Sequence, residues 1–256
     1  MNGSTVVRHS VQYGFKRTDF PSPQSHGAFV ILPEKPADGS PWVWYAPTFV
    51  TGDRPLPKPL HEWYLRPLLE AGFAVAGVDV GESWGSPAGR TGFNEFYHLV
   101  TRQFALSSKA CLLPQSRGGL MLYNWAAEHA ECVRCIGAIY PVCNIRHPQR
   151  LETVCKAYEL TSEQLLAQID RHHPPERLAP LAAAGVPILH IHGDRDEIVL
   201  LENNSGDLIR RYQALGGPGE LIIVHDKGHE EVPEYFERPE LLEFFLHQGA
   251  SVACGS

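Results

Sequence analysis

The sequence predicts an α/β fold, with a single domain built on an open, mostly parallel sheet that helices cover on both faces. Short buried apolar runs alternate with segments of helical periodicity from residue 42 to residue 246, and the links between them are short. The chain has 256 residues, of which 43% are hydrophobic, so it can bury one sizeable core. We therefore expect one domain over residues 1–256.

The order of the elements follows from the same patterns. Two β-prone runs at residues 6–14 and 28–32, separated by a loop with proline and serine, predict an N-terminal antiparallel hairpin at a sheet edge. Parallel strands are expected at residues 41–47, 73–80, 110–114, 132–141, 186–192 and 221–225. Helices are expected at residues 60–69, 93–104, 121–129, 202–215 and 239–247. Residues 81–92, rich in glycine and serine, are expected to form a loop.

Residues 142–184 predict a small helical insertion rather than a second domain. The pattern there is irregular and polar, with one clear helix whose start, Thr161-Ser-Glu-Gln164, has the spacing of a capping box. Because this segment contains no long apolar helix, we expect no large lid.

Composition excludes several classes of partner. The net charge of −7 and the pI near 6.0 leave no basic surface for nucleic acid or an anionic membrane. No segment approaches the ~18 apolar residues of a membrane span, and the first ten residues lack the apolar core of a signal peptide. Six irregularly spaced cysteines predict mostly free, buried thiols. We expect a cytoplasmic protein, with secretion after removal of a leader and the oligomeric state both left open.

The stretch Ala110-Cys-Leu-Leu-Pro-Gln-Ser-Arg-Gly-Gly-Leu120 predicts a strand, a sharp turn and a helix, with Ser116 at the apex. Such a turn holds a hydroxyl clear of the sheet, and the two glycines allow the helix to pack close to the strand. The helix also directs its free N–H groups at the serine. The alternative for a serine at this place is a plain helix N-cap.

Two more reactive side chains follow predicted strands. Asp196 lies in His-Gly-Asp-Arg-Asp-Glu-Ile-Val after the strand at 186–192, and His229 lies in Asp-Lys-Gly-His-Glu after the last strand. Carboxyl ends of parallel strands meet at one edge, so we expect both near Ser116. His229 would take the serine proton and Asp196 would orient the imidazole. Asp194, two residues earlier, is left open as the alternative acid.

These motifs resemble those of the α/β-hydrolase superfamily, over residues 42–246: a nucleophile elbow, an H-G-x-x-D-x-x-V loop and a G-H loop, in the order Ser, Asp, His. Pro114 replaces the first glycine of the usual G-x-S-x-G. The resemblance implies a serine hydrolase with Ser116, Asp196 and His229 as its catalytic residues. It also implies that the backbone N–H of Arg117 is one oxyanion donor, while Thr48 or Phe49 supplies the other, with Thr48 preferred.

Three segments carry a looser resemblance to small bacterial esterases that act on plant-polysaccharide esters, pectin-type methyl or acetyl esters among them. They are Trp-Val-Trp-Tyr-Ala-Pro at 42–47, Ser-Trp-Gly-Ser-Pro at 83–87 and Gln-Ser-Arg-Gly-Gly at 115–119. This resemblance implies a carboxylic ester hydrolase whose partner is a small-molecule or carbohydrate ester. Arg90 and Trp84 become candidates for binding a substrate carboxylate or sugar ring, although solvated loop residues are the simpler interpretation.

Two other functions stay open on the sequence. A serine peptidase of the prolyl-oligopeptidase type shares the elbow and the residue order, although its usual propeller domain would not fit in 256 residues. A non-catalytic small-molecule binding protein on the same fold is the other alternative. His190-Ile-His192, Cys132-Val-Arg-Cys135 and His172-His173 superficially suggest a metal site, but none has a second pair of ligands at suitable spacing. We therefore predict neither a metal nor a cofactor.

Overall fold

The computed structural model describes residues 6–47 and 56–249. Within them, nine strands form one sheet in the order β1-β2-β3-β5-β4-β6-β7-β8-β9. The strands are β1 (Arg8–Gln12), β2 (Phe15–Phe20), β3 (Gly27–Leu32), β4 (Trp42–Ala46), β5 (Ala74–Asp79), β6 (Ala110–Pro114), β7 (Val133–Ile139), β8 (Ile188–Gly193) and β9 (Gly219–Val224). Strands β1, β2, β3 and β5 pair antiparallel, and the pairs from β5 through β4 to β9 are parallel.

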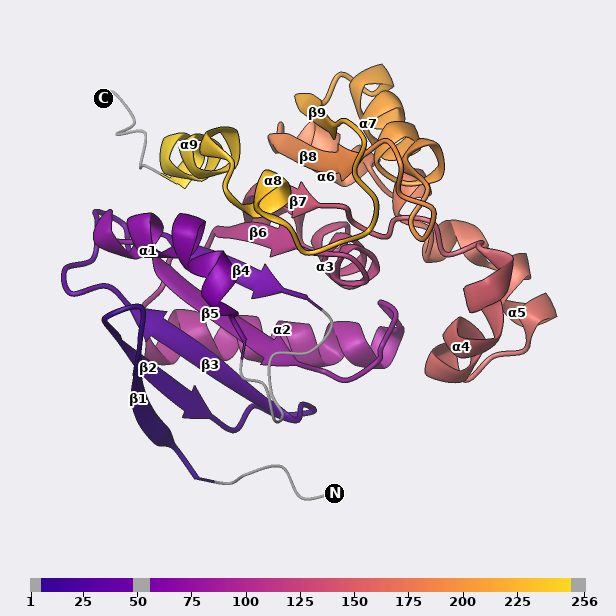
Figure 1. The fold of residues 1–256 in the computed structure, drawn as a ribbon. Helices are drawn as coiled ribbons and strands as arrows, with labels where there is room; N and C mark the ends of the chain where they lie inside the picture. Colours follow the sequence, from indigo (N-terminus) through magenta and orange to yellow (C-terminus); the bar gives the residue numbers. More distant parts are fainter. Residues whose placement is uncertain (1–5, 48–55, 250–256) are drawn as a thin grey trace.

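The helices that accompany this sheet lie on both of its faces, as Figure 1 shows. They are α1 (Glu62–Glu70), α2 (Pro87–Gln103), α3 (Gly118–Ala126), α4 (Pro148–Tyr158), α5 (Ser162–Ala167), α6 (Ala179–Ala183), α7 (Ser205–Ala214), α8 (Pro233–Phe236) and α9 (Pro239–Gly249). Single turns of 3₁₀ helix lie at Pro59–His61, Ala130–Cys132, Ile169–Arg171, Pro174–Glu176 and Leu201–Asn203. The predicted α/β architecture with a mostly parallel sheet is therefore confirmed.

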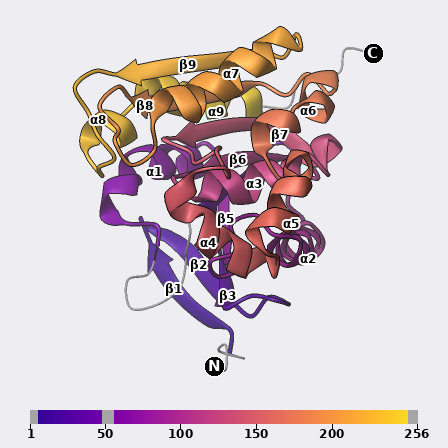
Figure 2. The ribbon, with the colours of Figure 1, turned by 90° about the vertical axis from the view of Figure 1, so that its right-hand side faces the viewer.

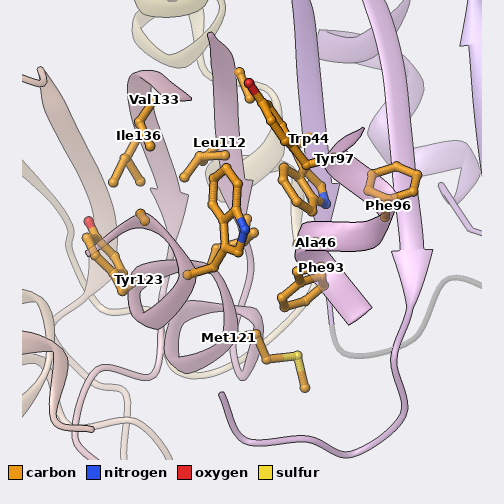
Figure 3. Packing of buried hydrophobic residues seen from close by; sticks show 14 of the residues in the cluster. Trp44, Ala46, Phe93, Phe96, Tyr97, Leu112, Met121, Tyr123, Val133 and Ile136 are labelled. Atoms are coloured by element: carbon orange, nitrogen blue, oxygen red, sulfur yellow. The ribbon is translucent and has the colours of Figure 1, made fainter. Parts of the chain in front are cut away.

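The sheet is buried on both faces because the side chains of its strands alternate in direction. In β4, Trp42 and Trp44 join a cluster with α2, α3 and α7, whereas Val43 and Tyr45 join a cluster with α1, α8 and α9. The ring of Trp44 lies 4.8 Å from that of Trp125 and packs against aromatic rings of α2 (Figure 3). The continuous apolar run that predicted this strand is thus the signature of a strand covered twice.

An N-terminal antiparallel hairpin is present, but it joins β1 to β2, whereas the sequence prediction joined residues 6–14 directly to residues 28–32. The chain turns at Tyr13 and Gly14, both with positive φ, and returns as β2 before β3 begins. The sequence prediction placed a loop over the whole of β2, because this strand carries Lys16, Arg17 and Asp19. Burial of the Arg17 side chain, which pairs with Asp19 and lies 4.4 Å from the ring of Phe29, explains how a charged strand is accommodated.

Helix α2 begins earlier than its sequence predicts. Pro87 occupies the first turn and the Ser86 hydroxyl accepts a hydrogen bond from Gly89 N at 3.3 Å, so residues 87–92 are helical rather than part of a loop. Gly89 weakened the helical pattern in the sequence. The structure explains why a glycine stands at position 89, because a Cβ there would lie 2.3 Å from the Cβ of Ser83.

The insertion contains more helix than expected. The predicted capping box is present at the start of α5, with both reciprocal hydrogen bonds between Thr161 and Gln164. Helix α4 precedes it and was not predicted, because its sequence is polar apart from a few apolar positions. Figures 1 and 2 show α4 and α5 beyond α3, outside the layers of the main sheet. Among the described residues, no helix has the length and apolar character needed to cross a bilayer.

Candidate active site

The turn between β6 and α3 holds Ser116 in a sharp bend. Its φ is +47°, a left-handed conformation that residues other than glycine rarely adopt. The bend is fixed on both sides: Ser116 N donates to Ile139 O at 3.2 Å, and Val142 N donates to Ser116 O at 2.7 Å. The hydroxyl consequently sits at the carboxyl edge of the sheet, between β6 and β7.

The two glycines after the turn are required by close packing. A Cβ on Gly118 would lie 1.8 Å from Ala46 O, and a Cβ on Gly119 would lie 2.5 Å from Val142 O. Real Cβ atoms do not approach backbone oxygens this closely, so only glycine fits. The first turn of α3 therefore packs directly against the backbone at the end of β4.

Pro114, which departs from the usual elbow pattern, lies where the sheet ladder is interrupted. The register between β6 and β7 runs to Leu112 opposite Ile136 and resumes at a single bridge between Gln115 and Ile139. A proline has no N–H to donate, and a gap in the ladder is a place where that loss is tolerated. Pairing with β4 continues, since Gln115 N donates to Ala46 O at 3.0 Å.

The structure brings Ser116, His229 and Asp196 together, although they are far apart in the sequence. Ser116 Oγ lies 2.9 Å from His229 Nε2, and His229 Nδ1 lies 2.8 Å from Asp196 Oδ2. The imidazole packs against the ring of Tyr140, at 4.5 Å between centroids. Because a carboxylate only accepts, Nδ1 carries the proton and Nε2 is left to accept one from the serine.

Asp196 is surrounded by hydrogen-bond donors. Its Oδ1 accepts from Ile198 N at 3.0 Å and from Val199 N at 2.7 Å, and its Oδ2 faces the rings of His229 and His192. Burial by itself would raise the pKa of this carboxyl. The hydrogen bonds from His192, His229 and Val199 N outweigh burial and hold the pKa well below 3.8. Asp196 is therefore a buried, fully ionised carboxylate.

Asp194, the alternative acid, lies elsewhere in the same loop. Its carboxylate contacts His225 Nδ1 at 2.9 Å and accepts from Asp226 N at 2.8 Å. These two bonds, the one to His225 foremost, lower its pKa. Of the two aspartates that the sequence left open, the one that hydrogen-bonds to His229 is Asp196.

Arg117 follows Ser116 as the N-cap of α3, so its backbone N–H lies at the positive end of that helix. Its side chain forms an ion pair with Glu82, and its guanidinium lies 5.7 Å from the ring centroid of Trp84. Burial raises the pKa of Glu82, against the opposing effect of Arg117. Thr48, the preferred second oxyanion donor, and Phe49 lie outside the described residues, so both remain predictions.

A cavity of about 390 Å³ opens beside Ser116. Its lining comes from the end of β4, the segment before Pro59, the elbow, the end of β7 and the loop after β9. The lining residues are Pro47, Leu56, Gln115, Ser116, Arg117, Tyr140, His229, Glu230 and Glu231. The charged side chains among them are Arg117, Glu230 and Glu231. Glu231 also pairs with Lys58, at 2.7 Å. Among the described side chains of this lining, and with the partners Glu82 and Lys58 counted, negative charges outnumber positive charges by one.

Arg90 and Trp84 occupy different surroundings from the ones their loop position suggested. Arg90 lines a second cavity of about 550 Å³, where its Nε lies 3.0 Å from a Glu128 carboxylate oxygen and its Nη1 donates to Gly85 O at 2.6 Å. It is not among the residues that line the cavity at Ser116. Trp84 is 5% exposed and packs with Leu120 of α3 and with apolar side chains of the insertion. A ring buried this deeply leaves little surface on which a sugar could stack.

Sequence reasoning missed four residues of this site: Tyr140, Glu230, Glu231 and His192. Three of them carried a usable signal, because Tyr140 follows β7 at the same edge as Ser116, and the two glutamates directly follow His229. The pKa of Tyr140 is raised by burial, so its hydroxyl stays protonated.

The residues considered for metal binding are arranged differently from a metal site. His190 and His192 both contact the hydroxyl of Ser205, and neither Cys132 nor Cys135 forms a disulfide. Within residues 6–47 and 56–249, no group of three or more histidine, cysteine or acidic side chains is placed to hold a metal ion.

Comparison with known proteins finds a family and several solved structures that are similar to this chain. The model of the prolyl oligopeptidase family (Peptidase_S9) matches residues 93–247. No curated protein matches the chain significantly. Among solved structures, an S-formylglutathione hydrolase from Agrobacterium tumefaciens superposes with a TM-score of 0.70 at 16% identity, covering 95% of this chain and 99% of the other. At such identities the likeness shows the fold, and it confirms the predicted α/β-hydrolase fold.

Two further structures extend the comparison. Est1E from Butyrivibrio proteoclasticus has a TM-score of 0.65 at 16% identity, covering 96% of this chain and 99% of that one. Dipeptidyl peptidase 4 from Porphyromonas gingivalis has a TM-score of 0.66 at 14% identity, covering 94% of this chain but only 35% of the other. The same fold is thus present in proteins of similar length and within a much longer peptidase.

Proposed function

Because the chain belongs to the prolyl oligopeptidase family and is a serine hydrolase of the α/β-hydrolase type, we propose that it cleaves carboxylic esters through an acyl-enzyme on Ser116. One observation carries this proposal: the continuous set of hydrogen bonds from Ser116 through His229 to Asp196, at 2.9 and 2.8 Å. A serine in a left-handed turn, paired with a neutral imidazole, is the arrangement that activates a hydroxyl for attack.

Each residue has a defined role in this proposal. His229 Nε2 removes the proton from Ser116 Oγ as the oxygen attacks the ester carbonyl, and then donates it to the departing alkoxide. Asp196 keeps the Nδ1–H tautomer and stabilises the imidazolium that forms. A water molecule, activated by the same imidazole, then hydrolyses the acyl-enzyme and frees Ser116 for the next cycle.

The negative charge on the carbonyl oxygen requires two donors aimed at one point. We assign the first to the backbone N–H of Arg117, since it follows the nucleophile at the start of α3. We assign the second to the backbone N–H of Thr48, because Pro47 at the rim of the cavity has none. Removing one such donor typically costs about 10²- to 10³-fold in kcat.

The ester assignment has support from the structural relatives, which include an S-formylglutathione hydrolase and Est1E. A peptidase remains the second candidate, because family membership and the Glu230 and Glu231 carboxylates would both suit a peptide with a free ammonium group.

Among the carbohydrate esters suggested by the sequence, the charges of the cavity favour neutral acetyl esters. A methyl uronate is itself neutral, but neighbouring free uronates along a pectin-type chain would meet Glu230 and Glu231. Arg117, the guanidinium in the described part of the lining, is already paired with Glu82. Contacts from Arg90 and Trp84 to a longer substrate remain a prediction.

The decisive experiment is a substrate panel assayed with the native protein and Ser116→Ala. Acetylated sugars, methyl uronates, short aryl esters and aminoacyl anilides are compared by kcat/KM. We expect ester cleavage that disappears in Ser116→Ala. Anilide cleavage at comparable efficiency would replace the esterase by a peptidase. Failure of a fluorophosphonate to label the native protein, with a small molecule still bound, would favour a binding protein instead.

A further inference from the structure

Two buried histidines of β8 have no role in the reaction described so far. His190 and His192 are completely buried and point to the same side of their strand. Their Nδ1 atoms lie 2.9 and 2.8 Å from a single hydroxyl, that of Ser205 at the start of α7. The other ring nitrogen of His190 contacts the Tyr123 hydroxyl at 2.5 Å. A continuous line of polar groups therefore runs through an otherwise apolar interior.

The direction of every hydrogen bond in this line follows from one acceptor. His192 Nε2 lies 2.7 Å from Val199 O, which can only accept, so the proton of neutral His192 is on Nε2. Its Nδ1 must then accept from the Ser205 hydroxyl. Since that hydroxyl has one proton, Ser205 Oγ accepts from His190 Nδ1, and His190 Nε2 accepts from Tyr123.

The line ends at the carboxylate that orients His229. His192 Nε2 lies 3.3 Å from Asp196 Oδ2, on which the bond from His229 Nδ1 also converges. The same Nε2–H binds Val199 O, while Val199 N donates to Asp196 Oδ1. His192 thus holds both the carboxylate and the far end of the turn that carries it.

We propose that His192 is a positioning residue for hydrolysis, which fixes Asp196 against His229, and that Ser205 holds His192 in the required tautomer. The proposal rests on the proposed function of Ser116, but its geometry does not depend on which ester is the substrate. His190 lies one step further away and touches only Ser205 and Tyr123 among these groups.

Removing His192 is expected to change the interaction between Asp196 and His229. A carboxylate that loses a donor interacts more strongly with the imidazolium that forms beside it during the reaction. Other groups facing Asp196 are Tyr140 from the end of β7, Tyr235 from α8 and Arg150 from α4. Burial raises the pKa of both tyrosines, so they stay neutral, and the guanidinium stays charged.

The test compares His192→Leu with His192→Gln, whose side-chain amide can still donate to Val199 O and Asp196. We expect His192→Leu to lower kcat for p-nitrophenyl acetate by about 10- to 100-fold with little change in KM. In the pH profile of kcat/KM, the acid limb should move to higher pH by about half a unit. His192→Gln should recover most of both effects. Ser205→Ala, a smaller change, should move the limb in the same direction.

His190→Leu is the matched control, because it removes an equally buried ring from the same strand without touching Asp196. It should lower the melting temperature while leaving the acid limb in place. Equal shifts in His190→Leu and His192→Leu, or no shift in folded His192→Leu, would overturn the proposal. If His192→Leu fails to fold, Ser205→Ala decides the outcome, because an acid limb that stays in place in this variant would overturn the proposal.

A spectroscopic measurement separates this proposal from the proposed function. The His229 Nδ1 proton, held between imidazole and carboxylate, should give a strongly downfield proton NMR signal in the absence of substrate. We expect this signal to shift or broaden in Ser205→Ala and to stay in place in His190→Leu. A signal unchanged in Ser205→Ala, or in folded His192→Leu, would contradict the positioning role even if the native protein hydrolysed no ester in the panel.

Discussion

Replacing Asp196 by asparagine should reverse the tautomer of His229. In the native site, the N–H groups of Ile198 and Val199 donate to Oδ1, so the asparagine oxygen must take that position. The amide NH₂ group is then forced toward His229 Nδ1. This nitrogen has to become an acceptor, its proton moves to Nε2, and His229 can no longer accept the proton of Ser116.

The size of the effect follows from that reversal. Where a carboxylate serves only to set the tautomer, its exchange for an amide lowers kcat by on the order of 10⁴, or about 5 kcal/mol of transition-state stabilisation. We expect a loss of 10³- to 10⁴-fold for Asp196→Asn at neutral pH, of the order seen for other triads. KM for a short aryl ester should change little, because the carboxylate does not line the cavity.

Asp194→Asn is the matched control, since it makes the same change two residues away. Asp194 contacts His225 and Asp226 N rather than His229, so we expect kcat within about twofold of the native value. Steady-state kinetics with p-nitrophenyl acetate, on protein shown to be folded by circular dichroism, gives both values. An Asp196→Asn variant with more than a tenth of native kcat would refute this reasoning, and so would equal losses in the two variants.

Three more outcomes follow from other parts of the structure. Gly118→Ala should destabilise the protein by about 3 kcal/mol in urea unfolding, because its Cβ would lie 1.8 Å from Ala46 O; a loss below about 1 kcal/mol would mean that the elbow can relax. Burial lowers the pKa of His190 to about 3, with a smaller contribution from His192 on the same strand. Between pH 6.5 and 3, the unfolded chain therefore binds a proton at this residue that the folded chain does not bind. Stability is therefore lost as the pH falls through this window, by about 2.5 kcal/mol from this group at pH 4.5, and His190→Leu should flatten the measured pH dependence. Arg90→Ala should leave kcat/KM for a short aryl ester within about threefold, because Arg90 lies outside the cavity at Ser116; a tenfold loss would restore the substrate contact predicted from its sequence position.

The sequence was most informative where local pattern and packing agree. The apolar run ending at Pro114, followed by a lone serine and two glycines, predicted the strand, the turn and the helix, and the structure contains all three. Continuous apolar strands were recognised because burial on both faces permits no polar position. β2 escaped prediction because it buries Arg17, whose charge is balanced by Asp19, a residue two positions away on the same strand.

Details that depend on the direction of a side chain could not be predicted. Asp194 and Asp196 lie in one turn, and only the hydrogen bonds of that turn determine which of them faces His229. Trp84 follows a strand at the catalytic edge, yet its backbone, with φ of +51°, turns the ring into the interior. Arg90 was expected in a loop, but the helix that begins at Pro87 directs it toward Glu128. Proximity in sequence to a catalytic edge was therefore a poor guide to which side chains reach it.

The edge of the sheet at β9 affects how the protein loses activity when it begins to unfold. Asp196 and His229 follow β8 and β9, and β9 is the outermost strand, with neighbours on one side only and several of its side chains partly open to water. Ser116, by contrast, follows β6, which lies in the middle of the sheet. Fraying of that outer strand would separate His229 from both Ser116 and Asp196 while the tryptophan-rich centre stayed intact. Enzymatic activity should thus be lost at a lower denaturant concentration than the one at which tryptophan fluorescence changes. Activity would then report on the integrity of this edge of the sheet.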